Sequence, residues 1–129
     1  MNPLYSFILI DDEPISNQLT EIQIKRVFDN ATIAGFNDAK EALTTIEQDY
    51  NDFANGTIIF LDINMPYPGW DFLTAFGNMP ANVTGRFKIY LLTALAEEED
   101  MARAKNYPMV LGQLEKPLTK DLLLDLARK

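Results

Sequence analysis

The chain has no cysteine and no histidine among its 129 residues. The absence of cysteine excludes disulfides and thiolate metal sites, and it fits a reducing cytoplasm. The absence of histidine excludes a phosphohistidine on this chain, a histidine-based triad and a zinc site of the usual kind. Any chemistry must therefore use carboxylates, hydroxyls, amides and lysine.

Positive charge and long hydrophobic runs are also scarce. The 11 lysines and arginines are outnumbered by 19 aspartates and glutamates, which gives a net charge of −8. That charge disfavours direct binding to nucleic acid and docking on anionic membranes. No stretch is long enough to span a bilayer, and no signal-peptide pattern is present. We therefore expect a cytoplasmic protein that binds neither nucleic acid nor membrane.

The apolar content is high enough for a folded domain. Apolar residues make up 47% of the chain, which argues against disorder. We expect one domain over residues 1–129, without repeats. Apolar runs and helical patterns alternate five times along it. The predicted strands span residues 5–10, 32–36, 57–61, 87–92 and 110–114. The predicted helices span residues 14–27, 38–49, 70–76, 97–106 and 119–128, and residues 78–85 are expected to form a loop.

Residues suited to capping precede several of these helices. Pro14 fits the first turn of the first helix, with Asp12 or Glu13 as its cap. The second helix can be capped by residues 37 and 38, which are Asn and Asp, and the fifth by Thr119.

Five polar side chains follow apolar strands: Asp11, Asp12, Asp62, Thr93 and Lys116. Alternating strands and helices predict an α/β fold, with a parallel sheet covered by helices on both faces. In such sheets the ligand site lies at the carboxyl ends of the strands. The five side chains are therefore expected to meet in one crevice.

The acidic residues of this set indicate a metal site. Asp11 and Asp12 alone would fit a helix cap and a solvated neighbour, but Asp62 also ends an apolar strand. Two carboxylates about 4 Å apart repel by roughly 4 kcal/mol at an effective dielectric near 20. Clustered acids therefore raise each other's pKa or recruit a cation, and oxygen-only ligands suit Mg²⁺.

The same set could carry out phosphoryl transfer. A carboxylate such as Asp62 can accept a phosphoryl group as a mixed anhydride. Mg²⁺, Lys116 and the Thr93 hydroxyl could each bind one phosphoryl oxygen. Taken singly, Thr93 also fits a β-branched strand residue and Lys116 an exposed surface lysine. It is their joint position at strand ends that favours the functional interpretation.

Four segments together resemble the receiver domain of two-component response regulators. The segments are Phe7-Ile8-Leu9-Ile10-Asp11-Asp12-Glu13-Pro14, Leu61-Asp62-Ile63-Asn64-Met65-Pro66, Leu91-Leu92-Thr93-Ala94 and Glu115-Lys116-Pro117-Leu118. They occur in the family's order over nearly the whole chain. The resemblance implies a flavodoxin-like doubly wound (βα)₅ fold with a five-stranded parallel sheet in the order 2-1-3-4-5.

The resemblance also implies a role for each site residue. Asp62 would be the phosphoacceptor, supplied by a histidine kinase or a histidine phosphotransfer protein. Asp11, Asp12 and Asp62 would bind Mg²⁺ with the backbone carbonyl of Asn64. Thr93 and Lys116 would contact the phosphoryl group, and the Lys116–Pro117 bond would be cis. Such a domain is not an enzyme beyond assisting its own phosphorylation and dephosphorylation, and it signals to a downstream protein target.

The sequence departs from the family pattern in two places. The loop after Met65-Pro66 reaches Gly69 one residue early, so the start of the third helix could differ. Gln113 occupies the position three residues before the lysine, where the family usually has an aromatic residue that moves inward as the threonine is recruited. Gln113 therefore puts the usual threonine–aromatic coupling in question.

Two other functions compete with that of a phosphoacceptor domain. A receiver-like protein-interaction module that signals without phosphorylation is opposed by the intact acid–threonine–lysine set but fits Gln113. A phosphatase of the haloacid-dehalogenase type needs a second aspartate two residues after its nucleophile. Neither Asp62 nor Asp12 has one, so this function is disfavoured.

The first predicted helix carries two apolar stripes, and only one can face the sheet. The stripes are Ile15, Leu19 and Ile22, and Thr20, Ile24 and Val27. We expect the phosphodonor to dock around the N-terminal part of this helix, because it borders the crevice. Ile15 is the best single candidate if its stripe is exposed, and a core residue if it is not.

Overall fold

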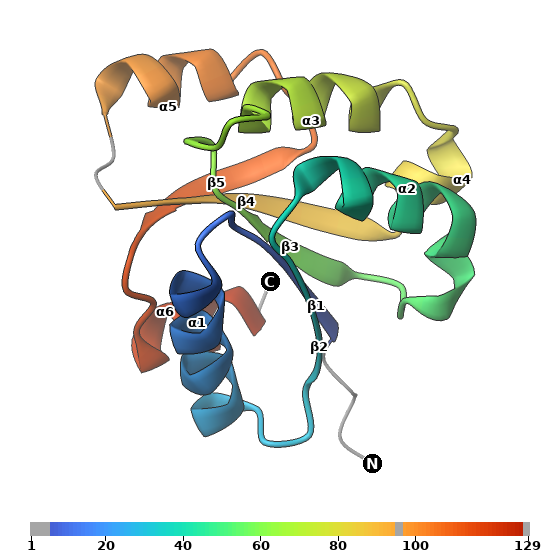
Figure 1. Ribbon diagram of the computed structural model, residues 1–129. Helices are drawn as coiled ribbons and strands as arrows, with labels where there is room; N and C mark the ends of the chain where they lie inside the picture. Colours follow the sequence, from blue (N-terminus) through green and yellow to red (C-terminus); the bar gives the residue numbers. More distant parts are fainter. Residues whose placement is uncertain (1–5, 95–96, 128–129) are drawn as a thin grey trace.

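The computed structural model describes residues 6–94 and 97–127, which form a five-stranded sheet covered by helices (Figure 1). The strands are β1 (Ser6–Ile10), β2 (Thr32–Phe36), β3 (Thr57–Leu61), β4 (Phe87–Thr93) and β5 (Val110–Glu115). The helices are α1 (Pro14–Val27), α2 (Ala39–Asp49), the 3₁₀ turn η1 (Tyr50–Asp52), α3 (Gly69–Gly77), α4 (Ala81–Thr84), α5 (Glu98–Ala104) and α6 (Lys120–Ala127).

The sheet is parallel throughout, and its strands lie in the order β2-β1-β3-β4-β5. This order confirms the predicted flavodoxin-like fold. The chain first builds outward from β1 to β2 and then returns to the other side of β1 with β3. The carboxyl ends of β1 and β3 are therefore neighbours at the point where the strand order reverses, which is where open α/β sheets bind ligands.

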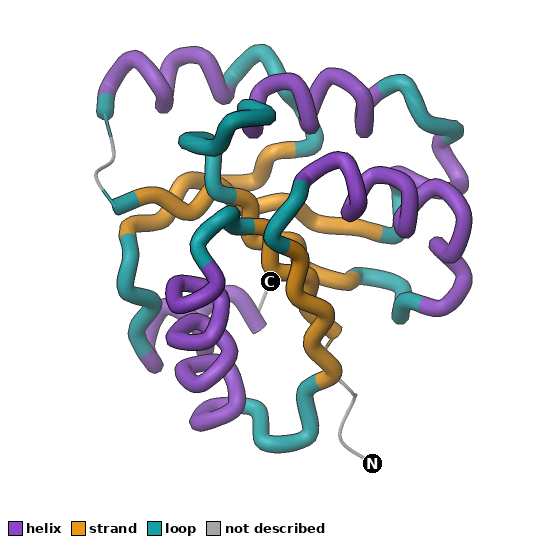
Figure 2. Tube along the Cα trace, in the orientation of Figure 1, coloured by secondary structure: helices purple, strands orange, loops and turns teal. Residues whose placement is uncertain are grey.

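Helices cover both faces of the sheet, as Figure 2 shows in purple around the orange strands. α1 and α6 lie on one face, and α2 and α3 lie on the other (Figure 1). Alternate residues of β1 supply both cores, because successive strand side chains point to opposite faces. Phe7 and Leu9 pack in the cluster that contains Ile24 of α1, whereas Ile8 and Ile10 pack in the cluster beneath α2 and α3.

The strand predictions agree closely with the structure. β2 and β3 have the predicted limits, while β4 and β5 each run one residue further, to Thr93 and Glu115. Thr93 pairs with Glu115 across the two strands, which explains the extension. The predicted first strand begins at residue 5 and the predicted last helix ends at residue 128, and both residues lie outside the described part of the chain.

α1 turns its second apolar stripe towards the sheet. Thr20 and Ile24 are buried, whereas Ile15, Leu19 and Ile22 are 70%, 59% and 48% exposed. Pro14 occupies the first turn as predicted, and Glu13 is the N-cap residue but makes no side-chain capping bond. The two alternatives for this helix are thereby resolved in favour of an exposed Ile15 stripe.

The predicted loop over residues 78–85 was wrong, because it contains the short helix α4. The Pro80 carbonyl accepts hydrogen bonds from the Val83 and Thr84 N–H groups, and Gly85 ends the turn. Proline and glycine indicated a break in the chain, but they also suit the two ends of a single helical turn. The turn η1 was missed as well, since three residues carry too little periodicity to be recognised.

Two predicted capping residues do cap their helices. The Asp38 side chain accepts a hydrogen bond from the Lys40 N–H at the start of α2. The Thr119 hydroxyl accepts one from the Leu122 N–H at the start of α6. Within residues 6–94 and 97–127, no helix has both the length and the apolar character needed to cross a membrane.

Candidate functional site

The carboxyl ends of β1 and β3 place Asp11 and Asp62 beside each other. Ile10 pairs with Leu61 across these strands, and the Asp62 N–H donates to the Ile10 carbonyl at 2.9 Å. β3 is buried throughout and β1 is buried from Phe7 onward, and the first charged residue after each strand emerges at the same sheet edge. The predicted convergence of these two residues is confirmed.

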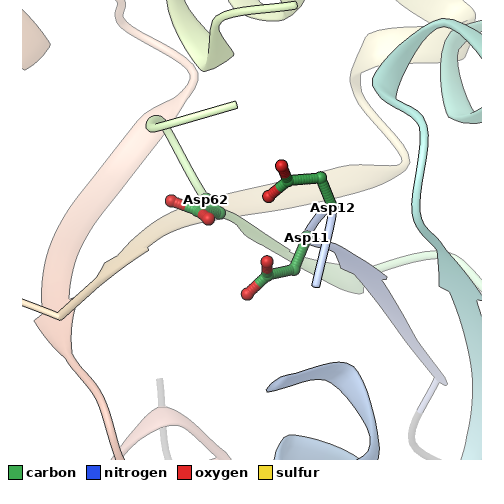
Figure 3. A group of neighbouring side chains, drawn as sticks. All are labelled: Asp11, Asp12 and Asp62. Carbon is green, nitrogen blue, oxygen red and sulfur yellow. The ribbon is translucent and has the colours of Figure 1, made fainter. Parts of the chain in front are cut away.

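Three carboxylates gather at this edge (Figure 3). One oxygen from each of Asp11, Asp12 and Asp62 lies within 4.8 Å of the others. Asp11 and Asp62 are only 4% and 8% exposed, whereas Asp12 is exposed to solvent. The cluster therefore has two buried oxygen donors and one that faces the opening.

Lys116 brings a positive charge to the same cluster. Its ammonium lies 2.5 Å from Asp11 Oδ2 and 3.8 Å from Asp62 Oδ2. The Lys116 N–H donates to the Thr93 carbonyl at 2.7 Å, which joins the ends of β4 and β5. The Lys116–Pro117 peptide bond is cis, as the resemblance predicted.

Thr93 and Asn64 belong to the same edge of the sheet as the three carboxylates. Thr93 is the last residue of β4 and is 1% exposed. The Asn64 N–H donates to Asp62 Oδ1 at 3.0 Å, so the loop after β3 folds over the carboxylate. All six predicted site residues thus belong to strand ends or loops at one edge of the sheet.

The pKa values of the two buried acids are shifted in opposite directions. Burial raises the pKa of Asp62 from 3.8 to about 6, and the neighbouring Asp11 charge adds to this effect. Burial would also raise the pKa of Asp11, but the Lys116 ammonium, the Ser16 hydroxyl and the Glu13 N–H outweigh it and hold that pKa below its usual value. In the metal-free protein Lys116 therefore stabilises mainly the Asp11 carboxylate.

This donor set fits a hard divalent cation such as Mg²⁺. All three side-chain donors are carboxylate oxygens, and the exposed Asp12 leaves room for water or a phosphoryl oxygen. Mg²⁺ prefers oxygen ligands and keeps several waters, so a site with few protein ligands suits it. A cation there would also relieve the repulsion between the Asp11 and Asp62 carboxylates, which adds to the effect of burial on the pKa of Asp62.

A short loop connects β3 to α3 and requires a glycine. A Cβ on Gly69 would lie 2.7 Å from the Ile63 Cα and 3.1 Å from the Asp62 carbonyl oxygen. Only glycine allows the helix start to approach the loop after β3 this closely. α3 accordingly begins at Gly69 itself, one residue earlier than predicted.

Sequence reasoning missed two asparagines next to the acids. The Asn37 side-chain amide donates to the Asp11 carbonyl at 3.0 Å, although it was expected to cap α2. The Asn17 amide donates to the carbonyls of Asp11, at 3.3 Å, and Phe36, at 3.0 Å. The position of Asn37 directly after a predicted strand was the one sequence signal that could have placed it near the acids. Nothing in the pattern of the first helix marked Asn17.

Gln113 lies on β5 with a buried amide. Both its side-chain nitrogen and its side-chain oxygen are buried, and neither has a hydrogen-bond partner among the described residues. Gln113 pairs with Leu91 in the sheet and lines a cavity of about 230 Å³ with Met101 and Leu111. This position differs in polarity from the aromatic residue that the resemblance would place there.

Comparison with known proteins gives a consistent result. The family model of the response regulator receiver domain matches residues 7–128. A response regulator receiver protein from Dyadobacter fermentans is similar in structure, with a TM-score of 0.87 and 25% identity over 96% of this chain and 95% of that one. A two-component response regulator from Cytophaga hutchinsonii has a TM-score of 0.86 and 27% identity over 98% of this chain and 96% of that one.

More distant structures share the fold alone. The chemotaxis response regulator CheY4 of Vibrio cholerae has a TM-score of 0.75 and 21% identity, with 98% of each chain covered. A search of curated proteins found no match.

Proposed function

Because this chain belongs to the response regulator receiver domain family, we propose that it accepts a phosphoryl group on Asp62 in a two-component phosphorelay. The observation that carries the proposal is the meeting of three carboxylates and Lys116 at the carboxyl edge of the sheet. The cluster holds a nucleophile, a candidate metal site and a cation for phosphoryl oxygens within one opening.

In the proposed reaction an oxygen of the Asp62 carboxylate attacks the phosphorus of a phosphohistidine. The P–O bond forms as the P–N bond breaks, and the imidazole leaves with the bonding electrons and takes up a proton. The product is a mixed anhydride on Asp62. Because this chain contains no histidine, the donor is a separate protein, either a histidine kinase or a histidine phosphotransfer protein.

Positioned charges would lower the barrier to this transfer. Mg²⁺, held by Asp11, Asp12, Asp62 and the Asn64 carbonyl, would neutralise charge on the phosphoryl oxygens when bound. The Lys116 ammonium is already 3.8 Å from Asp62 Oδ2, within reach of a second phosphoryl oxygen.

The remaining phosphoryl oxygen is assigned to a hydroxyl. We assign Thr93 to donate this hydrogen bond, since it ends β4 beside the strand that carries Asp62. Beyond assisting this transfer and the hydrolysis of the mixed anhydride to the carboxylate and inorganic phosphate, we propose no enzymatic activity on a separate substrate. The phosphorylated form would bind a downstream protein target.

The exposed face of α1 is the proposed docking surface for the donor. Ile15, Leu19 and Ile22 lie at helical spacing on one face and are all exposed. A row of large exposed apolar side chains is typical of a protein–protein contact. The row begins next to the crevice, because Ile15 follows the acid pair by only a few residues.

A labelling experiment tests the phosphoacceptor directly. Wild type incubated with acetyl phosphate and Mg²⁺ should gain one phosphoryl group in its intact mass. Asp62→Asn, or wild type with a chelator, should gain none. Label that persists in either sample would refute the assignment of Asp62 or its dependence on the cation.

A second candidate is a module that signals by binding alone, without phosphorylation. Gln113 favours it, because its polar side chain replaces the aromatic residue expected at this position. This candidate predicts that Asp62→Asn binds the downstream partner as tightly as phosphorylated wild type does.

A further inference from the structure

Two asparagine side chains link three separate segments beside the acid pair. Asn17 belongs to α1, and Asn37 follows β2. Both amides donate to the backbone carbonyl of Asp11, at 3.3 Å and 3.0 Å respectively. The Asn17 amide also donates to the Phe36 carbonyl at 3.0 Å, and this carbonyl accepts the Asp11 N–H at 3.1 Å.

The doubly bound carbonyl belongs to the peptide group between Asp11 and Asp12. A peptide group is planar, so two hydrogen bonds to its oxygen fix the orientation of the whole plane. That plane sets the direction in which the Asp12 Cα and side chain leave the strand. The two amides therefore act on Asp12 through the backbone, without touching its carboxylate.

Asp12 needs this indirect support more than its neighbours do. The Asp11 carboxylate is held by the Glu13 N–H at 3.0 Å and by Lys116. The Asp62 carboxylate is held by the Asn64 N–H. Asp12 is exposed, and no other side chain within the described ranges holds its carboxylate by a hydrogen bond or an ion pair.

We propose that Asn17 and Asn37 are positioning residues for the cation site, and that they aim Asp12 at the metal by fixing the Asp11–Asp12 peptide group. The inference rests on the proposed function, because it concerns the affinity of the Mg²⁺ site. It adds two residues that contact neither the cation nor the phosphoryl group. Side chains behind a metal ligand typically change metal affinity about 10- to 100-fold when they are removed.

A purely structural role makes a different prediction. If the amides only join α1 and β2 to β1, their removal lowers stability and leaves the Mg²⁺ affinity of the folded protein unchanged. The two roles therefore separate in a measurement of metal binding on folded variants. Asn82→Ala provides the matched control, because the Asn82 amide donates to the Tyr50 hydroxyl in a different part of the chain.

The experiment titrates Mg²⁺ into wild type, Asn17→Ala, Asn37→Ala and Asn82→Ala by calorimetry at pH 7.5, after circular dichroism has shown that each is folded. We expect Kd for Mg²⁺ to rise roughly tenfold in each of the first two variants and to stay unchanged in Asn82→Ala. The Mg²⁺ concentration for half-maximal labelling by acetyl phosphate should rise equally, while the rate at saturating Mg²⁺ stays near that of wild type. Asn37→Gln keeps an amide donor at an exposed position and should recover part of the affinity.

Each result leads to a definite conclusion. A Kd within twofold of wild type in both alanine variants would overturn the positioning role and leave the proposed function intact. Wild type that neither binds Mg²⁺ nor takes up label would overturn the proposed function itself. If Asn17→Ala does not fold, Asn37→Ala decides the question, since the Asn37 residue is exposed and its side chain makes a single hydrogen bond within the described part of the chain.

Discussion

The two sides of the acidic site are held in place by different means. On the side of β1 and β2, backbone and side-chain hydrogen bonds converge on Asp11 from α1, β2 and the loop after β2. On the side of β4 and β5, the helix α5 has no buried residue. Beneath it, the amide of Gln113 is buried without a partner in the described part of the chain.

Aromatic contacts hold the region of α5 on that second side. The Arg103 guanidinium lies 4.6 Å from the centre of the Trp70 ring, and Tyr107 stacks on Trp70 at 5.6 Å. Such contacts contribute about 0.5–1.5 kcal/mol each, so they can be exchanged at low cost. The side that would hold the cation is thus the more firmly held of the two, and we expect the side that would meet the phosphoryl group to rearrange more readily.

Lys116 joins the two sides, so its removal should have the largest effect. Lys116→Met keeps the apolar stem and deletes the charge that meets Asp11 and Asp62. We expect the rate of labelling by acetyl phosphate at saturating Mg²⁺ to fall roughly 100-fold, as for the loss of a donor to developing negative charge. Intact mass over time measures this rate.

The control for this prediction is Lys120→Met, an equivalent change at an exposed position of α6. It should label at the wild-type rate. Equal rates in the two variants would mean that the ammonium at the sheet edge does not act on the transfer.

The pKa of Asp62 predicts how the metal-free protein depends on pH. Burial raises this pKa from 3.8 to about 6, so between these values the folded state binds more protons than the unfolded state. The free energy of unfolding should therefore fall as pH rises through this window. Asp62→Asn should remove that loss and stabilise the metal-free protein by about 1–2 kcal/mol at pH 8.

Urea unfolding with a chelator at pH 4 and pH 8 tests this difference. The comparison of wild type with Asp62→Asn at each pH cancels the groups far from residue 62, which titrate alike in both proteins. A variant that is less stable than wild type at pH 8 would contradict the raised pKa. Added Mg²⁺ should stabilise wild type far more than the variant.

The fixed side of the site was largely predictable from the sequence. β1 and β3 are continuous apolar runs that end in aspartate, and parallel strands bring their carboxyl ends to one edge. The strand order and the meeting of Asp11, Asp62 and Lys116 follow from this local pattern together with the family resemblance. Local signals also set the limits of α1, where Pro14 begins the helix.

Features that depend on tertiary contacts were not predictable. The bond from Asn37 to Asp11 joins residues 26 positions apart, and the bond from Asn17 to Phe36 joins residues 19 positions apart, so no local pattern marks them. The choice of buried stripe on α1 was left open, because both stripes are apolar and only packing against α6 and the sheet decides between them. The segment with Pro80 and Gly85 was predicted as a loop, because a single helical turn is too short to show the helical repeat of apolar residues.

The exposed stripe of α1 can be compared with the β5 side of the molecule as a docking surface for the phosphodonor. Ile15→Ala should slow phosphoryl transfer from the cognate donor about fivefold at subsaturating donor, because it removes an apolar contact. Labelling by acetyl phosphate should not change. Leu111→Ala is the matched control, since Leu111 is 54% exposed on β5 and lies on the other side. Equal slowing in both variants, or slowing of acetyl-phosphate labelling, would argue against α1 as the docking surface.

The smallest expected effect concerns Gln113 and tests whether the β5 side is in fact the less satisfied one. A buried amide without a partner costs free energy, whereas an apolar side chain of similar size does not carry this cost. Gln113→Leu should therefore raise the free energy of unfolding by about 0.5–1 kcal/mol. The control, Gln48→Leu on the exposed face of α2, should leave it nearly unchanged. Urea unfolding of both variants at one pH measures the difference. If Gln113→Leu is no more stable than wild type, the amide is satisfied in solution, and the contrast between a fixed and a loosely held side would no longer include this residue.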